Sequence, residues 1–136
     1  MRAVLDANVL VSALLSPGGT PGEILARWTG GEFELVVSLH LLKELERTLN
    51  SPKIRDRVVA EESAQFVALL RDYAILADDP DVVPSRSPDA DDDYLLALAE
   101  AERAVLVSGD RHLLGLGDEF PILTPRVFFE TLKTQR

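Results

Sequence analysis

The 136-residue sequence contains no cysteine and only two histidines, His40 and His112. Without cysteine the chain cannot form disulfides, thiolate metal sites or a cysteine nucleophile. Two histidines alone also argue against a zinc site of the usual nitrogen and sulfur kind. If the protein binds a metal ion, oxygen atoms must hold it.

Basic residues are scarce as well, with 14 Lys and Arg against 23 Asp and Glu and a formal net charge of -9. This balance argues against a broad basic surface that coats nucleic acid through its phosphates. It does not exclude a nuclease, because cations bound in an acidic pocket reverse the sign of the local charge. An acidic protein of this size also suits a basic partner.

Long apolar runs are absent too. No segment approaches the roughly 20 apolar residues that span a membrane, and Asp6 interrupts the N-terminus before a signal peptide's apolar run. We therefore expect a cytoplasmic protein with no membrane segment. The length fits one domain over residues 1–136, and the 46% hydrophobic content is enough for a real core.

Short apolar runs alternate with helical patterns along the chain. The predicted strands are residues 3–5, 35–37, 74–76, 104–107 and 122–123. The predicted helices cover about residues 8–15, 21–28, 39–49, 54–59, 61–73, 92–102, 113–114 and 125–132, and residues 78–91 read as a loop. In the helix over 61–73, the expected apolar face is Phe66, Leu69, Leu70 and Tyr73. This alternation predicts an α/β sandwich around a mostly parallel sheet of about five short strands.

Two acids stand where such a sheet binds ligands, which is beyond the carboxyl ends of its strands. Asp6 ends the first strand, and Asp110 follows the strand at Val107 after a short turn. Each acid taken alone is equally well explained as the N-cap of a helix.

The run from Asp89 to Asp93 is more informative, because four of its five residues are acids. A helix dipole favours acids in its first turn, but the repulsion among four exceeds that gain unless a cation lies nearby. Glu44 lies beside the apolar stripe of its helix, and by pattern alone Glu46 would serve nearly as well. Carboxylate clusters hold Mg²⁺ or Mn²⁺, which activate water and relieve charge in phosphodiester hydrolysis.

Four motifs in this order and spacing resemble the PIN-domain family, in the branch described as toxins of toxin–antitoxin systems (VapC-like ribonucleases). The matching segments are residues 6–12, 38–45, 89–97 and 106–110, and the likeness extends over nearly the whole chain. It implies a PIN-like three-layer α/β/α sandwich around the parallel sheet, and a metal-dependent ribonuclease activity.

The resemblance assigns Asp6, Glu44 and Asp110 as catalytic acids and metal ligands, and so favours Glu44 over Glu46. Laid on the family pattern without gaps, the third acid is Asp92, which precedes Asp110 by 18 residues. Asp93 is the alternative at this position, or a supporting residue.

The resemblance also places Asn8 and Ser108 at polar positions that steady metal-bound waters. The family's usual proline in the acidic run is Ala90 here, which affects the geometry of the loop rather than the acids. From the sequence itself, the cations expected to meet RNA phosphates are Arg86, Arg111, Lys43 and Arg47.

The predicted function is a ribonuclease that uses Mg²⁺ or Mn²⁺, acting as the toxin of a pair with a small basic antitoxin and forming a homodimer. Two alternatives stay open, a PIN-fold RNA- or protein-binding module without catalysis and a housekeeping RNA-processing nuclease. A receiver-like domain fits poorly, because lysine occurs only at 43, 53 and 133 and none lies near the last strand. A phosphatase of the haloacid dehalogenase type would need an aspartate where Asn8 stands.

Overall fold

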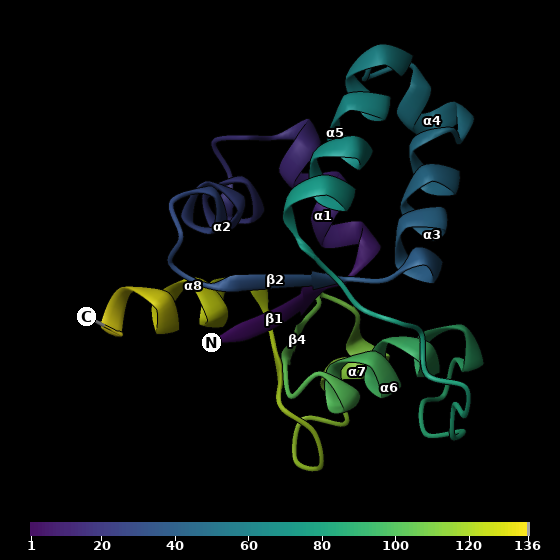
Figure 1. Cartoon of the computed structure of the whole chain (residues 1–136), viewed down its shortest axis with the longest axis vertical. Helices are drawn as coiled ribbons and strands as arrows, with labels where there is room; N and C mark the ends of the chain where they lie inside the picture. Colours follow the sequence, from purple (N-terminus) through teal and green to yellow (C-terminus); the bar gives the residue numbers. More distant parts are fainter. Residues whose placement is uncertain (136) are drawn as a thin grey trace.

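Five short strands, all parallel, form the centre of the computed structural model, which describes residues 1–135 (Figure 1). Their order across the sheet is β3-β2-β1-β4-β5. The strands are β1 (Arg2–Leu5), β2 (Glu34–Val37), β3 (Ile75–Leu76), β4 (Val105–Val107) and β5 (Ile122–Leu123). The predicted parallel sheet is therefore confirmed.

Helices cover both faces of this sheet. Figure 1 shows α1 to α5 on one side and α6 and α7 on the other, which confirms the predicted α/β/α layers. The helices are α1 (Ala7–Leu15), α2 (Thr20–Thr29), α3 (Leu39–Leu49), α4 (Pro52–Arg55), α5 (Ala60–Tyr73), α6 (Asp93–Ala101), α7 (Arg111–Leu114) and α8 (Pro125–Thr134). A single 3₁₀ turn, η1 (Ala90–Asp92), precedes α6. Within residues 1–135, no helix combines the length and the apolar character needed to cross a membrane.

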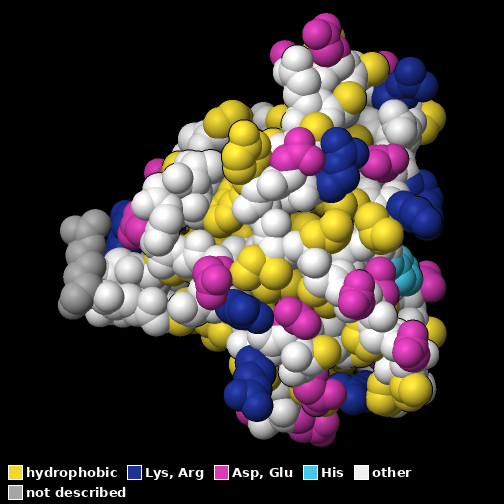
Figure 2. Space-filling model, viewed as in Figure 1, with side chains coloured by type: hydrophobic (Ala, Val, Ile, Leu, Met, Phe, Trp, Pro, Cys, Tyr) yellow, Lys and Arg dark blue, Asp and Glu magenta, His cyan; other side chains and the backbone are white. Residues whose placement is uncertain are grey.

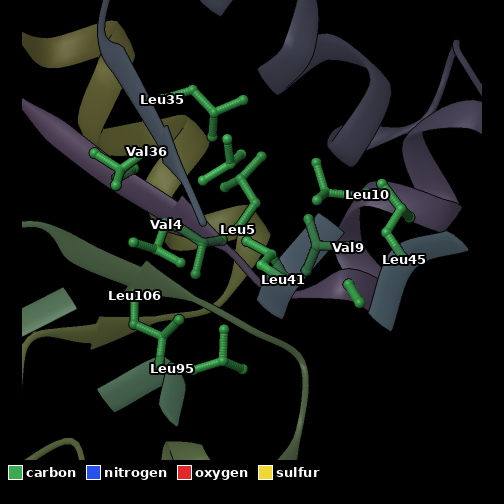
Figure 3. Packing of buried hydrophobic residues seen from close by; sticks show 14 of the residues in the cluster. Val4, Leu5, Val9, Leu10, Leu35, Val36, Leu41, Leu45, Leu95 and Leu106 are labelled. Atoms are coloured by element: carbon green, nitrogen blue, oxygen red, sulfur yellow. The ribbon is translucent and has the colours of Figure 1, made fainter. Parts of the chain in front are cut away.

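The core follows from the alternation of side chains along paired strands. Val4 is paired with Leu106 of β4, so the two side chains share one face of the sheet. Figure 3 shows Leu106 facing Leu95 of α6, whereas Leu5 points to the opposite face, toward residues of α1 and α3. All four of these residues are at most 1% exposed, so both faces of the sheet are dry.

Side-chain caps begin the helices where the sequence predicts them. The Ser38 hydroxyl accepts a hydrogen bond from the Leu41 N–H at 3.2 Å and caps α3. The Thr124 hydroxyl does the same for the Val127 N–H of α8 at 3.1 Å. These bonds satisfy backbone donors that a helix start leaves unpaired.

Three local predictions need correction. The short helix is α4 rather than 54–59, because Pro52 occupies its first position and Ser51 precedes it. Helix α6 begins one residue later than predicted, after the 3₁₀ turn. On α5 the buried apolar residues are Phe66, Val67 and Leu70, whereas the other two residues of the expected face, Leu69 and Tyr73, are 38% and 76% exposed.

The strand order creates the place for a site. From β1 the chain first moves to β2 and β3 on one side, and later returns to β4 and β5 on the other. Parallel sheets bind ligands at the point where the winding reverses, beyond the carboxyl ends of the two strands concerned. Here that point lies after Leu5 and Val107, which are paired with each other.

Leu69 and Leu70 give a matched test of this core, since they are neighbours on α5 and only Leu70 is fully buried. Leu70→Ala should lower the free energy of unfolding by about 2–5 kcal/mol, because it leaves a cavity in the core. Leu69→Ala should lower it by less than about 1 kcal/mol. Urea unfolding followed by circular dichroism measures both, and equal losses would show that the α5 face is assigned wrongly.

Candidate active site

Asp6 leaves the end of β1 and caps α1, and both of its carboxylate oxygens are bound. Oδ1 accepts a hydrogen bond from the Asn8 backbone N–H at 2.7 Å. Oδ2 accepts one from the Ser108 hydroxyl at 2.6 Å. The side chain is buried, with 7% exposure. Asp6 is thus held in one orientation at the switch point of the sheet.

Ser108 links Asp6 to a second acid. It follows β4, is fully buried, and its hydroxyl oxygen accepts a hydrogen bond from the Asp110 N–H at 3.0 Å. The Asp110 carboxylate in turn accepts the His112 N–H at 2.7 Å and caps α7. The two strand-end acids predicted from the sequence are therefore joined through one serine.

Glu44 of α3 is oriented by a residue to which the sequence analysis gave no role. The Tyr94 hydroxyl of α6 donates a hydrogen bond of 2.6 Å to Glu44 Oε2. Burial of the Tyr94 phenol and its hydrogen bond to Glu44 raise the pKa of Tyr94 well above its usual range, so the phenol remains a neutral donor. The contact joins residues 50 positions apart, so no local sequence signal could have found it.

Asp92 is the acid whose pKa is raised by its surroundings. Burial, together with the negative charges of Asp110, Asp89, Asp6 and Glu44, raises the pKa of Asp92 to about 6. The other three predicted acids therefore lie near enough to Asp92 for their charges to act on it. The Oδ2 atom of Asp92 is buried and has no hydrogen-bond partner.

This set of groups suits a hard divalent cation. All of the candidate ligand atoms are carboxylate oxygens, the ligand type that Mg²⁺ and Mn²⁺ favour. The Oδ2 atom of Asp92 has no hydrogen-bond partner and is therefore available to bind such an ion. Among residues 1–135, no three His, Asp or Glu side chains are already drawn together at metal-holding positions. The acids therefore converge on a common region without closing on a single point, as mutually repelling carboxylates do.

Asp93 has a different role from its neighbour. It is 4% exposed, and its Oδ1 accepts the backbone N–H groups of Arg86 and Ser87 at 3.1 and 2.7 Å. These bonds fasten the loop before α6 to the first turn of the helix. They favour Asp92 over Asp93 as the third acid of the site, an assignment that stays a prediction.

The four cations expected to meet RNA fall into two groups. Arg86 donates to Glu100 at 2.9 Å, and its guanidinium lies 5.2 Å from the centre of the Phe120 ring. Arg86 is thus engaged within the protein. The exposed residues of the group are Lys43, Arg47 and Arg111, and within residues 1–135 none of them forms an ion pair. Figure 2 shows acidic and basic side chains interspersed on the face it displays, with no continuous basic surface.

Comparison with known proteins identifies the family. Residues 2–112 match the PIN domain, and the chain belongs to the PIN-domain family. PIN domains are generally nucleases that use divalent metal ions. The chain is similar to the uncharacterized protein MJ1680 of Methanocaldococcus jannaschii, with 28% identity over 140 residues that cover 96% of this chain and 90% of that protein.

Two crystal structures share the fold at low sequence identity. The structure of PAE2754 from Pyrobaculum aerophilum superposes with a TM-score of 0.68 and 16% identity, covering 99% of this chain and 91% of that one. A chain in the structure of VapBC2 from Rickettsia felis, bound to a DNA fragment from their promoter, superposes with a TM-score of 0.61 and 15% identity. The match covers 91% of this chain and 97% of that one. The resemblance to the PIN family and its fold is confirmed.

Asp92→Asn should stabilise the metal-free protein at neutral pH. Because the pKa of Asp92 is raised in the folded protein, this group's contribution to the free energy of unfolding is fully present below the ordinary value of 3.8. That contribution is lost as the pH rises through about 6. The asparagine carries no charge and lacks this loss, so the variant should exceed the wild type at pH 7 and lose its advantage near pH 4. Urea unfolding with a chelator at both pH values measures the difference.

The exposed neighbour Asp91 supplies the control, since Asp91→Asn should change little at either pH. If Asp92→Asn is less stable than the wild type at pH 7, the repulsion around Asp92 is assigned wrongly.

Asp93→Ala should have the opposite effect and lower the free energy of unfolding by about 1–3 kcal/mol, because two backbone N–H groups lose their acceptor. Asp93→Asn keeps an acceptor oxygen and should cost less. Amide hydrogen exchange at Arg86 and Ser87 provides a local measurement, and exchange unchanged in the alanine variant would contradict this role.

Proposed function

We propose that this chain is a divalent-metal-dependent ribonuclease that hydrolyses RNA phosphodiester bonds at Asp6, Glu44, Asp92 and Asp110. Asp92 carries the proposal, because its buried oxygen lacks a partner while burial and neighbouring carboxylates raise its pKa. A bound Mg²⁺ or Mn²⁺ would satisfy that oxygen and offset the repulsion. Within the proposal, the chain acts as one nuclease domain.

The protein's own contribution is to hold the acids in place. Ser108 and the Asn8 N–H fix Asp6, and Tyr94 fixes Glu44. Asp93 supports Asp92 indirectly by fastening the preceding loop. When bound, the ion would supply an activated water and relieve negative charge on the scissile phosphate.

RNA binding in this proposal relies on few cations. Lys43, Arg47 and Arg111 are exposed and are assigned to phosphate contacts. Arg86 is left out of this group, because Glu100 and Phe120 already engage it. Few phosphate contacts imply a shallow dependence of affinity on salt concentration.

We also infer the biological setting, a cytoplasmic toxin paired with a small basic antitoxin and assembled as a homodimer. Two observations support it, the likeness to a chain of VapBC2 and the net charge of -9, which suits a basic partner. A gene for a small basic DNA-binding protein beside this one would favour the toxin over a housekeeping nuclease.

Catalysis is tested on the purified protein with Mn²⁺ and single-stranded RNA. Cleavage should occur and should stop on chelation. Glu44→Gln should lower kcat/KM by about 100-fold or more, since even supporting residues of metal sites cost 10–100-fold. Glu46→Gln on the exposed side of the same helix should leave the rate within about twofold. Initial rates on a labelled oligoribonucleotide measure both variants.

Two outcomes would contradict the nuclease. One is no cleavage of single-stranded or structured RNA by folded protein whose melting temperature rises with Mn²⁺, which would favour a binding module. The other is cleavage that persists in an Asp6→Asn, Asp110→Asn double variant, which would reveal a contaminating nuclease.

A further inference from the structure

A cleft of about 540 Å³ lies beside the acids, between α3 and the segment that leads into α6. Its lining includes His40, Glu44, Arg47, Val83 and Tyr94. Glu44 belongs both to this cleft and to the candidate metal site, so a molecule in the cleft lies directly next to the acids. The volume exceeds what a single nucleobase needs.

The cleft has an aromatic platform. The imidazole of His40 stacks on the Tyr94 ring with a centroid distance of 3.7 Å and an angle of 7° between the planes. Tyr94 is buried and is tied to Glu44 through its hydroxyl. The backbone N–H of His40 donates to Asp79 Oδ2 at 3.0 Å. The Tyr94 ring is therefore held in place, and His40, whose backbone is anchored, is the exposed member of the stack.

Two other residues of the lining, Val83 and Arg47, suit parts of a nucleotide, and Thr48, Ala90 and Asp91 complete the wall. Val83 is 42% exposed and adds an apolar surface, which suits the face or edge of a base. Arg47 adds a positive charge that suits a phosphate. Proteins commonly bind unpaired bases by stacking them on aromatic rings next to cations.

We propose that this cleft binds one unpaired nucleobase of the RNA, stacked on His40, beside the phosphate that the acids act upon. The inference rests on the proposed function, and it narrows the substrate to RNA with an unpaired base at the cleavage site. Bases within a duplex are already stacked and paired, so they are not available to the cleft.

The test compares adenosine 5′-monophosphate with ribose 5-phosphate, which lacks the base, in Mg²⁺ buffer. NMR titration of the ¹⁵N-labelled protein gives both dissociation constants. The wild type should bind the nucleotide about 10-fold more tightly, the gain expected from stacking one base. His40→Ala should bring the ratio of the two constants close to one, whereas His40→Phe should retain most of the preference. Tyr73→Ala, which removes an exposed aromatic ring outside the cleft, should leave the ratio unchanged.

Equal affinity of the wild type for the two ligands would overturn the proposal, as would an unchanged ratio in folded His40→Ala protein. Tighter binding of arginine amide than of the nucleotide, lost in His40→Ala, would assign the cleft to a basic protein segment and also overturn it. The readout is independent of cleavage. A nucleotide preference in a protein that cuts no RNA would support the cleft and contradict the nuclease, and cleavage without the preference would do the reverse.

Discussion

The pairing of β1 with β4 is the constraint on which the site depends. These strands are far apart in the sequence, yet Leu5 is paired with Val107, and the Asp6 N–H donates to the Val107 carbonyl at 3.1 Å. Because both strands run in the same direction, their next residues emerge at one edge. Asp6 and Ser108 thus come within hydrogen-bond distance, and the burial of apolar side chains on both faces fixes this register.

Holding several acids near this edge opposes folding, and the core must compensate for it. Burial and the neighbouring carboxylates raise the pKa of Asp92. Asp6 and Glu44 each accept a hydrogen bond from a hydroxyl group, that of Ser108 and that of Tyr94. Those hydroxyls orient the two carboxylates. The site therefore combines two kinds of acid, some already satisfied by the protein and one that lacks a partner.

Much of this arrangement is predictable from the sequence, for physical reasons. Strands such as 105–107 are short runs of buried apolar residues, and Ser38 and Thr124 are local caps, so neighbouring residues suffice to find them. Asp6 and Asp110 could be predicted as site residues because each closely follows a predicted strand. The Tyr94 bond to Glu44 spans 50 residues, and no local pattern reports such a contact. The sequence also did not predict that Leu69 is exposed. Periodicity shows which face of α5 is apolar, but it does not show which residues at the edge of that face are covered by the rest of the protein.

Asp93 has a consequence for how the loop before α6 can vary. Its carboxylate binds the backbone of Arg86 and Ser87 rather than their side chains. A backbone N–H is present in every residue other than proline. The side chains of this loop can therefore be exchanged widely while its attachment next to Asp92 stays the same. One buried carboxylate thus sets the position of these two loop residues without specifying their identity.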